Sequence, residues 1–481
     1  MRSSLCCTGV LLAAFVATLV PHSAQGDPMN PNTDWFQKAR YGVFVHYLDG
    51  LQNNAEQINS LGRQTTWDQC VREFDTERFA DTMAEVGAGY VMFTIMQVSR
   101  YMIAPNATYD RLTGYKPGEA CATRDLVEDL YKSLSRRGIP LMLYFTGDGP
   151  RADDKANAAF GFTNPVTKQF VEKWASVARE YGERYKDKVA GYWVDGSYPF
   201  IGYDDEKMAI FAKGLKAGNP KRIVAFNRGV DPQVMAYTHE EDFTCGEQNQ
   251  FYDVPAQRFL SGEQWHILSF LGPSWAQPGS KYTKRELADY VYAVCARGGV
   301  VSIDAALFRD GSLDRSQVEM LKGLKVVRAE LDSGKPRPAV PPGNLAYHKQ
   351  AKLLSLDGSH PVEVNSGVCF ARNGVDGRLD TIALAGGEWA WTFEVDLVDI
   401  VPVRRVKVTF GKGYATQFEI RLSEDGVKWQ TVASKTDGDG KPFGATFEPV
   451  KGRYIRVCGI KPDGPNQPGS QMSIAELEVY Q

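Results

Sequence analysis

Short apolar stretches rich in β-branched and aromatic residues recur between residues 41 and 304, and amphipathic stretches separate most of them. Two of the amphipathic stretches are "TRDLVEDLYKSLSRRG" and "NPVTKQFVEKWASVAREYGERYK", which show helical spacing. Alternating strands and helices predict an α/β fold with a parallel sheet, and eight such units predict a (β/α)₈ barrel. The predicted strands are 41–47, 88–96, 140–145, 190–195, 222–227, 242–247, 265–270 and 298–304.

The pattern changes after residue 331. The stretch "DSGKPRPAVPPGNLA" is rich in proline and glycine, which neither a helix nor a central strand tolerates. Beyond it, short stretches of alternating polarity and turn signals such as "EDG" predict an all-β sandwich. We therefore expect a barrel over 27–331, a linker over 332–343 and a sandwich over 344–481.

The first residues, "MRSSLCCTGVLLAAFVATLVPHSAQG", have a basic start, an apolar run and small residues near a cleavage point. This layout predicts a signal peptide over 1–26 and an exported protein, secreted or periplasmic. No later stretch predicts a membrane span. The formal net charge of −3 argues against nucleic-acid or membrane partners.

Six cysteines follow the predicted signal peptide, and their spacing matches no zinc site. An exported protein can form disulfides. Cys369–Cys458 and Cys70–Cys121 are two candidate pairs, and the sequence does not decide the pairing.

Several predicted strands end in polar residues. In a barrel these ends share one mouth, where active sites lie. Asp195, in "VAGYWVDGSYPF", also fits a plain Asp-Gly turn. The recurrence of polar strand ends favours a site. The residues concerned are His46, Asp195, Asn227, Glu247 and Asp304.

Over about residues 34–330 the chain resembles glycoside hydrolase family 29, the α-L-fucosidases. The motifs that carry the resemblance are "WFQKARYGVFVHY", "VGAGYVMFT", "TRDLVEDLYKSLSRRGIPLMLYF", "GYWVDG", "RIVAFNRG", "EDFTCGEQ", "WHILSFLGPSW" and "ARGGVVSIDAALFRDG". The resemblance implies a retaining glycosidase with Asp195 as nucleophile and a second carboxyl group as acid/base, without a metal or organic cofactor for the chemistry. In such enzymes the two carboxyl groups lie about 5–5.5 Å apart.

Glu247 matches a glutamate that the family often has at that strand end, and it is the predicted acid/base. Family members also commonly carry a glutamate where this chain has His266, which we place among the substrate-binding candidates. The nearby Glu240 and Glu241 are interpreted as a solvated acidic turn.

The resemblance also implies contacts with the sugar. His46 matches a histidine that would bind sugar hydroxyls. Trp193 could pack on a sugar face or plug the barrel, and Trp275 could shield the site or close the core.

One segment departs from the family. Where members have a pair of histidines that grip fucose, this chain has Gln97 and Val98, and Val98 cannot form a hydrogen bond through its side chain. Arg100 replaces a glycine and could bind a substrate carboxylate or sulfate, or pair with a residue of its own.

The C-terminal part resembles the discoidin, or coagulation-factor type C, domain, a family that includes carbohydrate-binding modules. In calcium-bearing members the positions of Asp376, Asp380 and Glu476 supply ligands to the ion. A purely structural loop is the alternative. Trp389 could contact a ligand or the interior.

The sequence thus predicts an exported glycoside hydrolase that releases a terminal sugar, with fucose favoured, from a glycan. One alternative is a glycosidase of the same fold with another sugar. Another is a non-catalytic carbohydrate-binding protein, which the missing histidine pair favours and Asp195 opposes. The sequence leaves the oligomeric state open.

Overall fold

The structure is a computed structural model that describes residues 30–231, 233–334, 343–347, 349–362, 370–377, 379–386, 389–461 and 471–481. The predicted signal peptide lies outside these residues, as does most of the predicted linker. No helix in the described parts of the chain is long and apolar enough to cross a bilayer.

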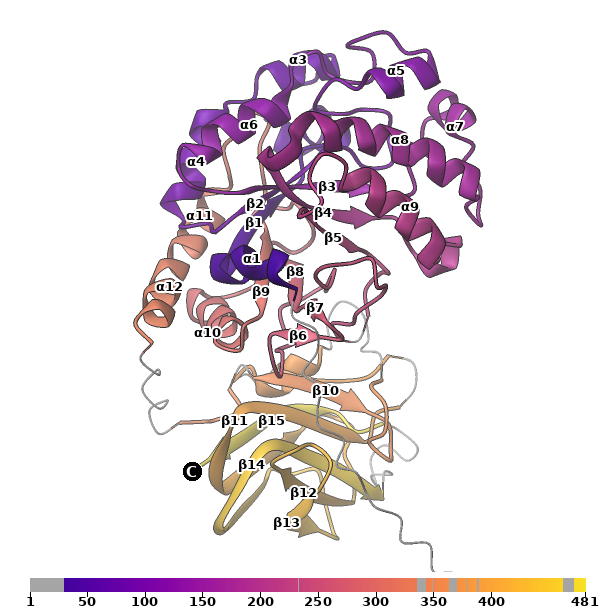
Figure 1. Ribbon diagram of the computed structural model, residues 1–481. Coiled ribbons are helices and arrows are strands. Elements are labelled where there is room, and N and C mark those ends of the chain that lie inside the picture. Colours follow the sequence, from indigo (N-terminus) through magenta and orange to yellow (C-terminus); the bar gives the residue numbers. More distant parts are fainter. Residues whose placement is uncertain are drawn as a thin grey trace, which may run out of the picture.

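The N-terminal part is built on a curled, all-parallel sheet of seven strands in the order β5-β4-β3-β2-β1-β9-β8. Helices surround this sheet (Figure 1). The predicted α/β fold is therefore confirmed. The strands are β1 (Tyr41–Val45), β2 (Val91–Thr94), β3 (Leu141–Thr146), β4 (Val189–Asp195), β5 (Ile223–Phe226), β8 (His266–Phe270) and β9 (Val300–Asp304).

The predicted strand 242–247 is irregular, yet it occupies the gap between the two edge strands of the curled sheet. The Asp242 amide donates to the Val224 carbonyl of β5 (2.8 Å), and the Gln248 amide donates to the Leu268 carbonyl of β8 (2.9 Å). Gly246 has φ of 64°, and a Cβ there would lie 2.0 Å from the His266 carbonyl oxygen. This glycine allows the segment to approach β8 closely, and the bent backbone prevents a regular strand.

The helices that pack around the sheet show the predicted spacing and caps. Asp125 and Thr167 accept hydrogen bonds from the first turns of α6 and α8. The helices are α1 (Asp34–Ala39), α2 (Asp49–Gln52), α3 (Trp67–Arg72), α4 (Thr76–Glu85), α5 (Ala107–Thr113), α6 (Leu126–Ser135), α7 (Asp154–Phe160), α8 (Lys168–Tyr185), α9 (Asp205–Leu215), α10 (Lys284–Cys295), α11 (Arg315–Lys322) and α12 (Leu324–Asp332). Short 3₁₀ helices are η1 (Pro31–Thr33), η2 (Ile58–Ser60), η3 (Lys186–Lys188), η4 (Pro199–Ile201) and η5 (Ala371–Val375).

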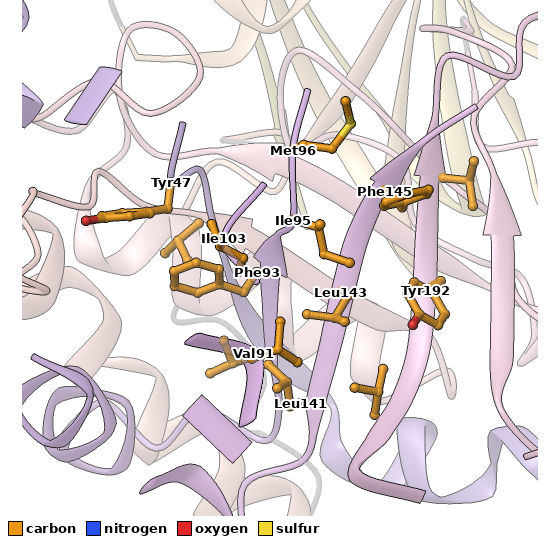
Figure 2. Close-up of a cluster of buried hydrophobic side chains, with 14 of the residues drawn as sticks. Tyr47, Val91, Phe93, Ile95, Met96, Ile103, Leu141, Leu143, Phe145 and Tyr192 are labelled. Carbon is orange, nitrogen blue, oxygen red and sulfur yellow. The ribbon is translucent and has the colours of Figure 1, made fainter. Parts of the chain in front are cut away.

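Side chains of successive strand residues separate into two buried clusters. Val91 and Phe93 belong to the larger one, which packs the sheet against the helices (Figure 2). Met92 and Tyr144 belong to the smaller one, which fills the interior of the curled sheet together with Trp193. Because side chains alternate along a strand, Asp195 shares the inner face with Trp193 and ends that column.

The C-terminal part is an antiparallel all-β domain, as predicted. It lies against the end of the N-terminal part near β6 (Phe259–Leu260), β7 (Glu263–Gln264) and α10 (Figure 1). Two of the stretches of alternating polarity, 389–398 and 404–411, contribute to one long strand interrupted by bulges, β11, because its pairing with β14 shifts register without ending. The strands are β10 (Gln350–Leu354), β11 (Thr392–Phe410), β12 (Gln417–Ser423), β13 (Gln430–Lys435), β14 (Phe443–Lys461) and β15 (Ile474–Tyr480).

Polar contacts connect the two parts. Arg297 donates to the Val398 carbonyl (2.8 Å) and pairs with Asp399 (3.2 Å). Gln350 donates to Asp253 (3.2 Å). The all-β domain is thus tied to the N-terminal part through α10 and the segment before β6.

The candidate disulfide Cys70–Cys121 is not formed, because both cysteines are buried and free. The Cys70 thiol contacts the Tyr47 hydroxyl instead (3.5 Å). The other candidate pair involves Cys369, which lies outside the described residues.

Candidate active site

A cavity of about 490 Å³ opens at the carboxyl ends of the parallel strands. Its walls combine three acidic side chains, those of Asp49, Asp195 and Glu247, with aromatic and apolar side chains, as in many small-molecule sites. The residues that line it are Phe44, His46, Leu48, Asp49, Gly50, Leu51, Gln97, Val98, Ser99, Tyr144, Trp193, Asp195, Glu247, Leu268, Trp275 and Ala276.

Asp195 lies at the end of β4, and side-chain hydrogen bonds surround its carboxylate. Oδ1 accepts from the Tyr198 hydroxyl (2.7 Å) and from Asn227 Nδ2 (2.9 Å). Oδ2 accepts from the Tyr144 hydroxyl (2.5 Å) and from Gln97 Nε2 (3.5 Å). Burial and the charge of Asp195 hold the pKa of Tyr144 well above its usual range, so this phenol stays a donor. These four donors hold the carboxylate in one orientation.

Asn227, which follows β5, connects the two carboxyl groups. Its Nδ2 donates to Asp195 Oδ1 at 2.9 Å and to Glu247 Oε2 at 2.5 Å. The two oxygens therefore lie no further apart than the sum of these lengths, about 5.4 Å. This upper limit is compatible with the ~5–5.5 Å between the carboxyl groups of retaining glycosidases and lies below the ~6.5–9.5 Å of inverting ones.

Glu247 has a different environment from Asp195. Burial, followed by the nearby charge of Asp195, raises the pKa of Glu247 to about 7, although the hydrogen bond from Asn227 lowers it. A carboxyl group of this kind keeps its proton up to about pH 7, well above the usual range of a glutamate. One carboxylate stabilised by donors beside one kept protonated is the arrangement that separates nucleophile from acid.

His46 and Trp275 form another wall of the cavity. His46 Nδ1 lies 2.9 Å from Asp304 Oδ1, and Asp304 Oδ2 accepts from the Ala276 amide (2.7 Å). Asp304 thereby fixes the imidazole ring and the loop that carries Trp275. The rings of His46 and Trp275 meet edge to face at 6.0 Å.

Gln97 and Trp193 also reach the cavity. Gln97 Nε2 donates to the Tyr144 hydroxyl (2.9 Å). The Trp193 ring stacks on Tyr144 with centroids 5.4 Å apart, and its Nε1 donates to the Cys245 carbonyl (2.9 Å). Trp193 is therefore both a cavity wall and a plug of the barrel interior.

His266 does not reach the cavity, so its predicted contact with substrate is not supported. The residue is fully buried, with Nδ1 2.9 Å from the Thr244 carbonyl and Nε2 2.8 Å from the Ser302 hydroxyl. Burial lowers the pKa of His266 to about 4, so the ring is neutral. It packs the barrel interior.

Arg100 likewise does not line the cavity, and the alternative of a partner within the chain fits the structure. Its guanidinium pairs with Asp153 (3.2 Å) and donates to the Tyr101 hydroxyl (2.8 Å). The group is therefore already engaged and is not directed at a substrate anion.

The acidic residues before Glu247 are structural. Glu241 is buried and accepts from the Tyr237 amide (2.6 Å), so its interpretation as part of a solvated turn is wrong. Asp242 pairs with Lys216 (2.7 Å) and accepts from the Val224 amide (2.9 Å). Neither residue lines the cavity.

The predicted calcium ligands do not form a cluster. Among the described residues, no group of three or more His, Cys, Asp or Glu side chains could hold a metal ion. Glu476 accepts from the Gly377 amide (3.0 Å), Asp376 accepts from Thr381, and Asp380 is exposed. The calcium site that the resemblance implied stays a prediction.

The sequence analysis did not single out Tyr144, Tyr198 or Asp49. Tyr144 lies on the inner face of β3, two residues before the strand end. Trp193 has the same position on β4, so the sequence could have indicated Tyr144 in the same way. Tyr198 lies on a loop and Asp49 begins the four-residue helix α2, and neither segment has a regular sequence pattern that orients a side chain.

Sequence comparison assigns the chain to a class and then to a family. A family model described as alpha-L-fucosidase matches residues 64–325, more than half of the 481-residue chain. The protein is a glycoside hydrolase. It belongs to the α-L-fucosidase family. A second model, described as a NedA-like, galactose-binding domain, matches residues 373–457. No curated protein matches the chain.

Several solved structures are similar to this chain. A glycoside hydrolase 29 fucosidase from Ruminococcus gnavus, solved with fucose, has 15% identity and a TM-score of 0.43, with 95% of each chain covered. A glycoside hydrolase 29 family member from an unknown rumen bacterium has 13% identity and a TM-score of 0.44, covering 94% of this chain and 77% of that one. A chitosan-binding module from Paenibacillus sp. IK-5 has 30% identity and a TM-score of 0.24, covering 29% of this chain and 98% of the module.

Proposed function

We propose that the protein is an exported, retaining α-L-fucosidase that releases terminal α-L-fucose from glycans. The observation that carries the retaining mechanism is the hydrogen bonding of Asp195 and Glu247 to one amide nitrogen of Asn227. An inverting enzyme needs about 6.5–9.5 Å between its carboxyl groups to admit a water molecule. The signal-peptide pattern over 1–26 supports export.

The reaction proceeds in two displacements. Asp195 attacks the anomeric carbon as the bond to the leaving oxygen breaks, and Glu247 gives its proton to that oxygen. A water molecule then attacks the glycosyl–Asp195 ester, Glu247 takes a proton from the water, and Asp195 leaves as a carboxylate. Side chains of this chain supply every group in these steps.

Fucose fits a cavity wall that contains both apolar and hydrogen-bonding side chains. Fucose is a 6-deoxy sugar, so it presents a methyl group beside its hydroxyls. Leu48, Leu51 and Val98 provide apolar wall for a methyl group, whereas His46 and Gln97 provide hydrogen-bonding groups. The C-terminal domain, which matches a galactose-binding family model, adds a second contact with the glycan.

Hydrolysis of a panel of 4-nitrophenyl glycosides tests the sugar. We expect turnover of the α-L-fucoside and little turnover of α-D-galactoside, β-D-galactoside or α-L-rhamnoside. Proton NMR of the first product then tests the mechanism, because retention releases α-L-fucose before mutarotation. Turnover of another sugar alone would contradict the fucose assignment, and initial release of the β anomer would contradict retention.

The raised pKa of Glu247 predicts the alkaline side of the pH profile. The acid must carry its proton to protonate the leaving oxygen, so kcat/KM for a fucosyl disaccharide should fall as pH rises through about 7. α-L-Fucosyl fluoride serves as control, because fluoride leaves without a proton. Its kcat/KM should stay level over the same range, and a parallel fall for both substrates would assign the titration to another group.

A further inference from the structure

A pair of stacked aromatic rings stands on the loop that follows β4. The Tyr198 and Phe200 rings lie 4.8 Å apart with an interplanar angle of 12°. The Tyr198 hydroxyl donates to Asp195 Oδ1, and Phe200 is 72% exposed. Tyr198 therefore connects the two: its hydroxyl binds the nucleophile Asp195, and its ring stacks on the exposed ring of Phe200.

The loop is anchored, so the exposure of Phe200 does not come from a loose segment. Ile201, next to Phe200, is buried, and its carbonyl accepts from the Val166 amide (2.7 Å). The Ser197 hydroxyl donates to the Asn227 carbonyl (3.0 Å), and the Ser197 carbonyl accepts from the Tyr237 hydroxyl (3.0 Å). The backbone thus turns Ile201 inward and presents Phe200 to solvent.

Tyr198, on which Phe200 stacks, contacts the edge of Asp195 that faces the acid. Oδ1 accepts from Tyr198 and from Asn227, and Asn227 also donates to Glu247. The other oxygen, Oδ2, faces Tyr144 and Gln97 in the cavity. Because Glu247 protonates the leaving oxygen, the leaving group departs along the Oδ1 edge.

Further apolar side chains lie on the loop that follows Asn227. Val230 is 49% exposed and Met235 is 38% exposed. A single exposed apolar side chain is ordinary, but two neighbouring loops tied together beside one edge of a site suggest a binding surface. The flat apolar face of a pyranose ring suits an aromatic surface of this kind.

We propose that Phe200, supported by the stacked Tyr198, binds the sugar ring to which fucose is attached. The substrate class is then a fucosyl oligosaccharide whose neighbouring sugar presents its apolar face to Phe200. This inference rests on the proposed function, because it assigns the leaving-group side of the same site.

Two kinds of substrate distinguish binding of the leaving-group sugar by Phe200 from the bond-breaking steps at Asp195 and Glu247. α-L-Fucosyl fluoride has no leaving-group sugar, whereas disaccharides of α-L-fucose with galactose or N-acetylglucosamine do. We expect Phe200→Ala to lower kcat/KM for the best-cleaved disaccharide about three- to tenfold and to leave that for the fluoride unchanged. Phe200→Trp should preserve both values, because it keeps an aromatic face.

Val427→Ala is the matched control, since Val427 is 79% exposed in the C-terminal domain, and both substrates should be unaffected. An equal fall for fluoride and disaccharide in Phe200→Ala, or no fall for either, would overturn the assignment. Cleavage of the fluoride but of no disaccharide by the unaltered protein would overturn it as well. If the unaltered protein does not cleave the fluoride, the proposed function itself fails and this inference falls with it.

Discussion

Asp195→Ala is expected to lower kcat for 4-nitrophenyl α-L-fucoside by a factor on the order of 10⁴–10⁶, because it removes the group that attacks the anomeric carbon. The loss should not reflect unfolding, since the Asp195 side chain is only partly buried at a cavity wall. Thermal unfolding of the variant and steady-state kinetics together check this expectation.

Added azide makes the test specific to the nucleophile. A small anion can occupy the space left by the carboxylate and attack the anomeric carbon directly, so azide should restore turnover and yield β-L-fucosyl azide. Asp231→Ala is a suitable control, because Asp231 pairs with Arg228 on the neighbouring loop and does not line the cavity. A variant at Asp195 that keeps substantial activity without azide would contradict its role as nucleophile.

Sequence reasoning located Asp195, Asn227 and Glu247 because strand ends follow a rule. In a parallel sheet the carboxyl ends of the strands lie together, so a polar residue at each end predicts a shared site. Alternation along β4 also puts Asp195 on the same face as Trp193. These inferences need only the pattern of apolar and polar residues along each strand and the parallel sheet that this pattern predicts.

Comparison with the resembled family was a poorer guide where the role of a residue depends on its partners. His266 stands at a strand start and looked available to a sugar, yet Thr244 and Ser302 satisfy both ring nitrogens in the interior. For Arg100 the sequence left a substrate anion and a partner within the chain open, and the partner is Asp153, 3.2 Å away and 53 residues later in the chain. No periodic pattern encodes such contacts between distant segments.

The irregular segment 242–247, the sixth of the eight predicted strands, shows a second limit. The stretch 242–247 has the composition of a strand, but Gly246 lies at positive φ against the His266 carbonyl. The bend it produces falls next to Glu247, whose carboxyl group then meets Asn227. A pattern of apolar residues predicts that the segment closes the sheet and does not predict how its backbone turns at the end.

Glu247→Gln is expected to separate the two steps of the reaction. For a fucosyl disaccharide, whose leaving oxygen needs a proton, kcat/KM should fall by about 10²–10⁴. For α-L-fucosyl fluoride the first step needs no acid, so kcat/KM should change little. The second step still lacks its base, so kcat for the fluoride should fall and a pre-steady-state burst of fluoride should appear.

Added azide also distinguishes the acid/base role of Glu247 from the nucleophile role of Asp195. In Glu247→Ala it should attack the glycosyl–Asp195 intermediate and yield α-L-fucosyl azide, the anomer opposite to the one expected from Asp195→Ala. Glu240→Gln is the matched control, since Glu240 precedes the same segment and does not line the cavity. Equal losses for disaccharide and fluoride, or the same azide anomer from both alanine variants, would contradict the division of labour between the two carboxyl groups. Unequal losses together with opposite azide anomers would assign the nucleophile to Asp195 and the acid to Glu247, the two carboxyl groups that Asn227 connects.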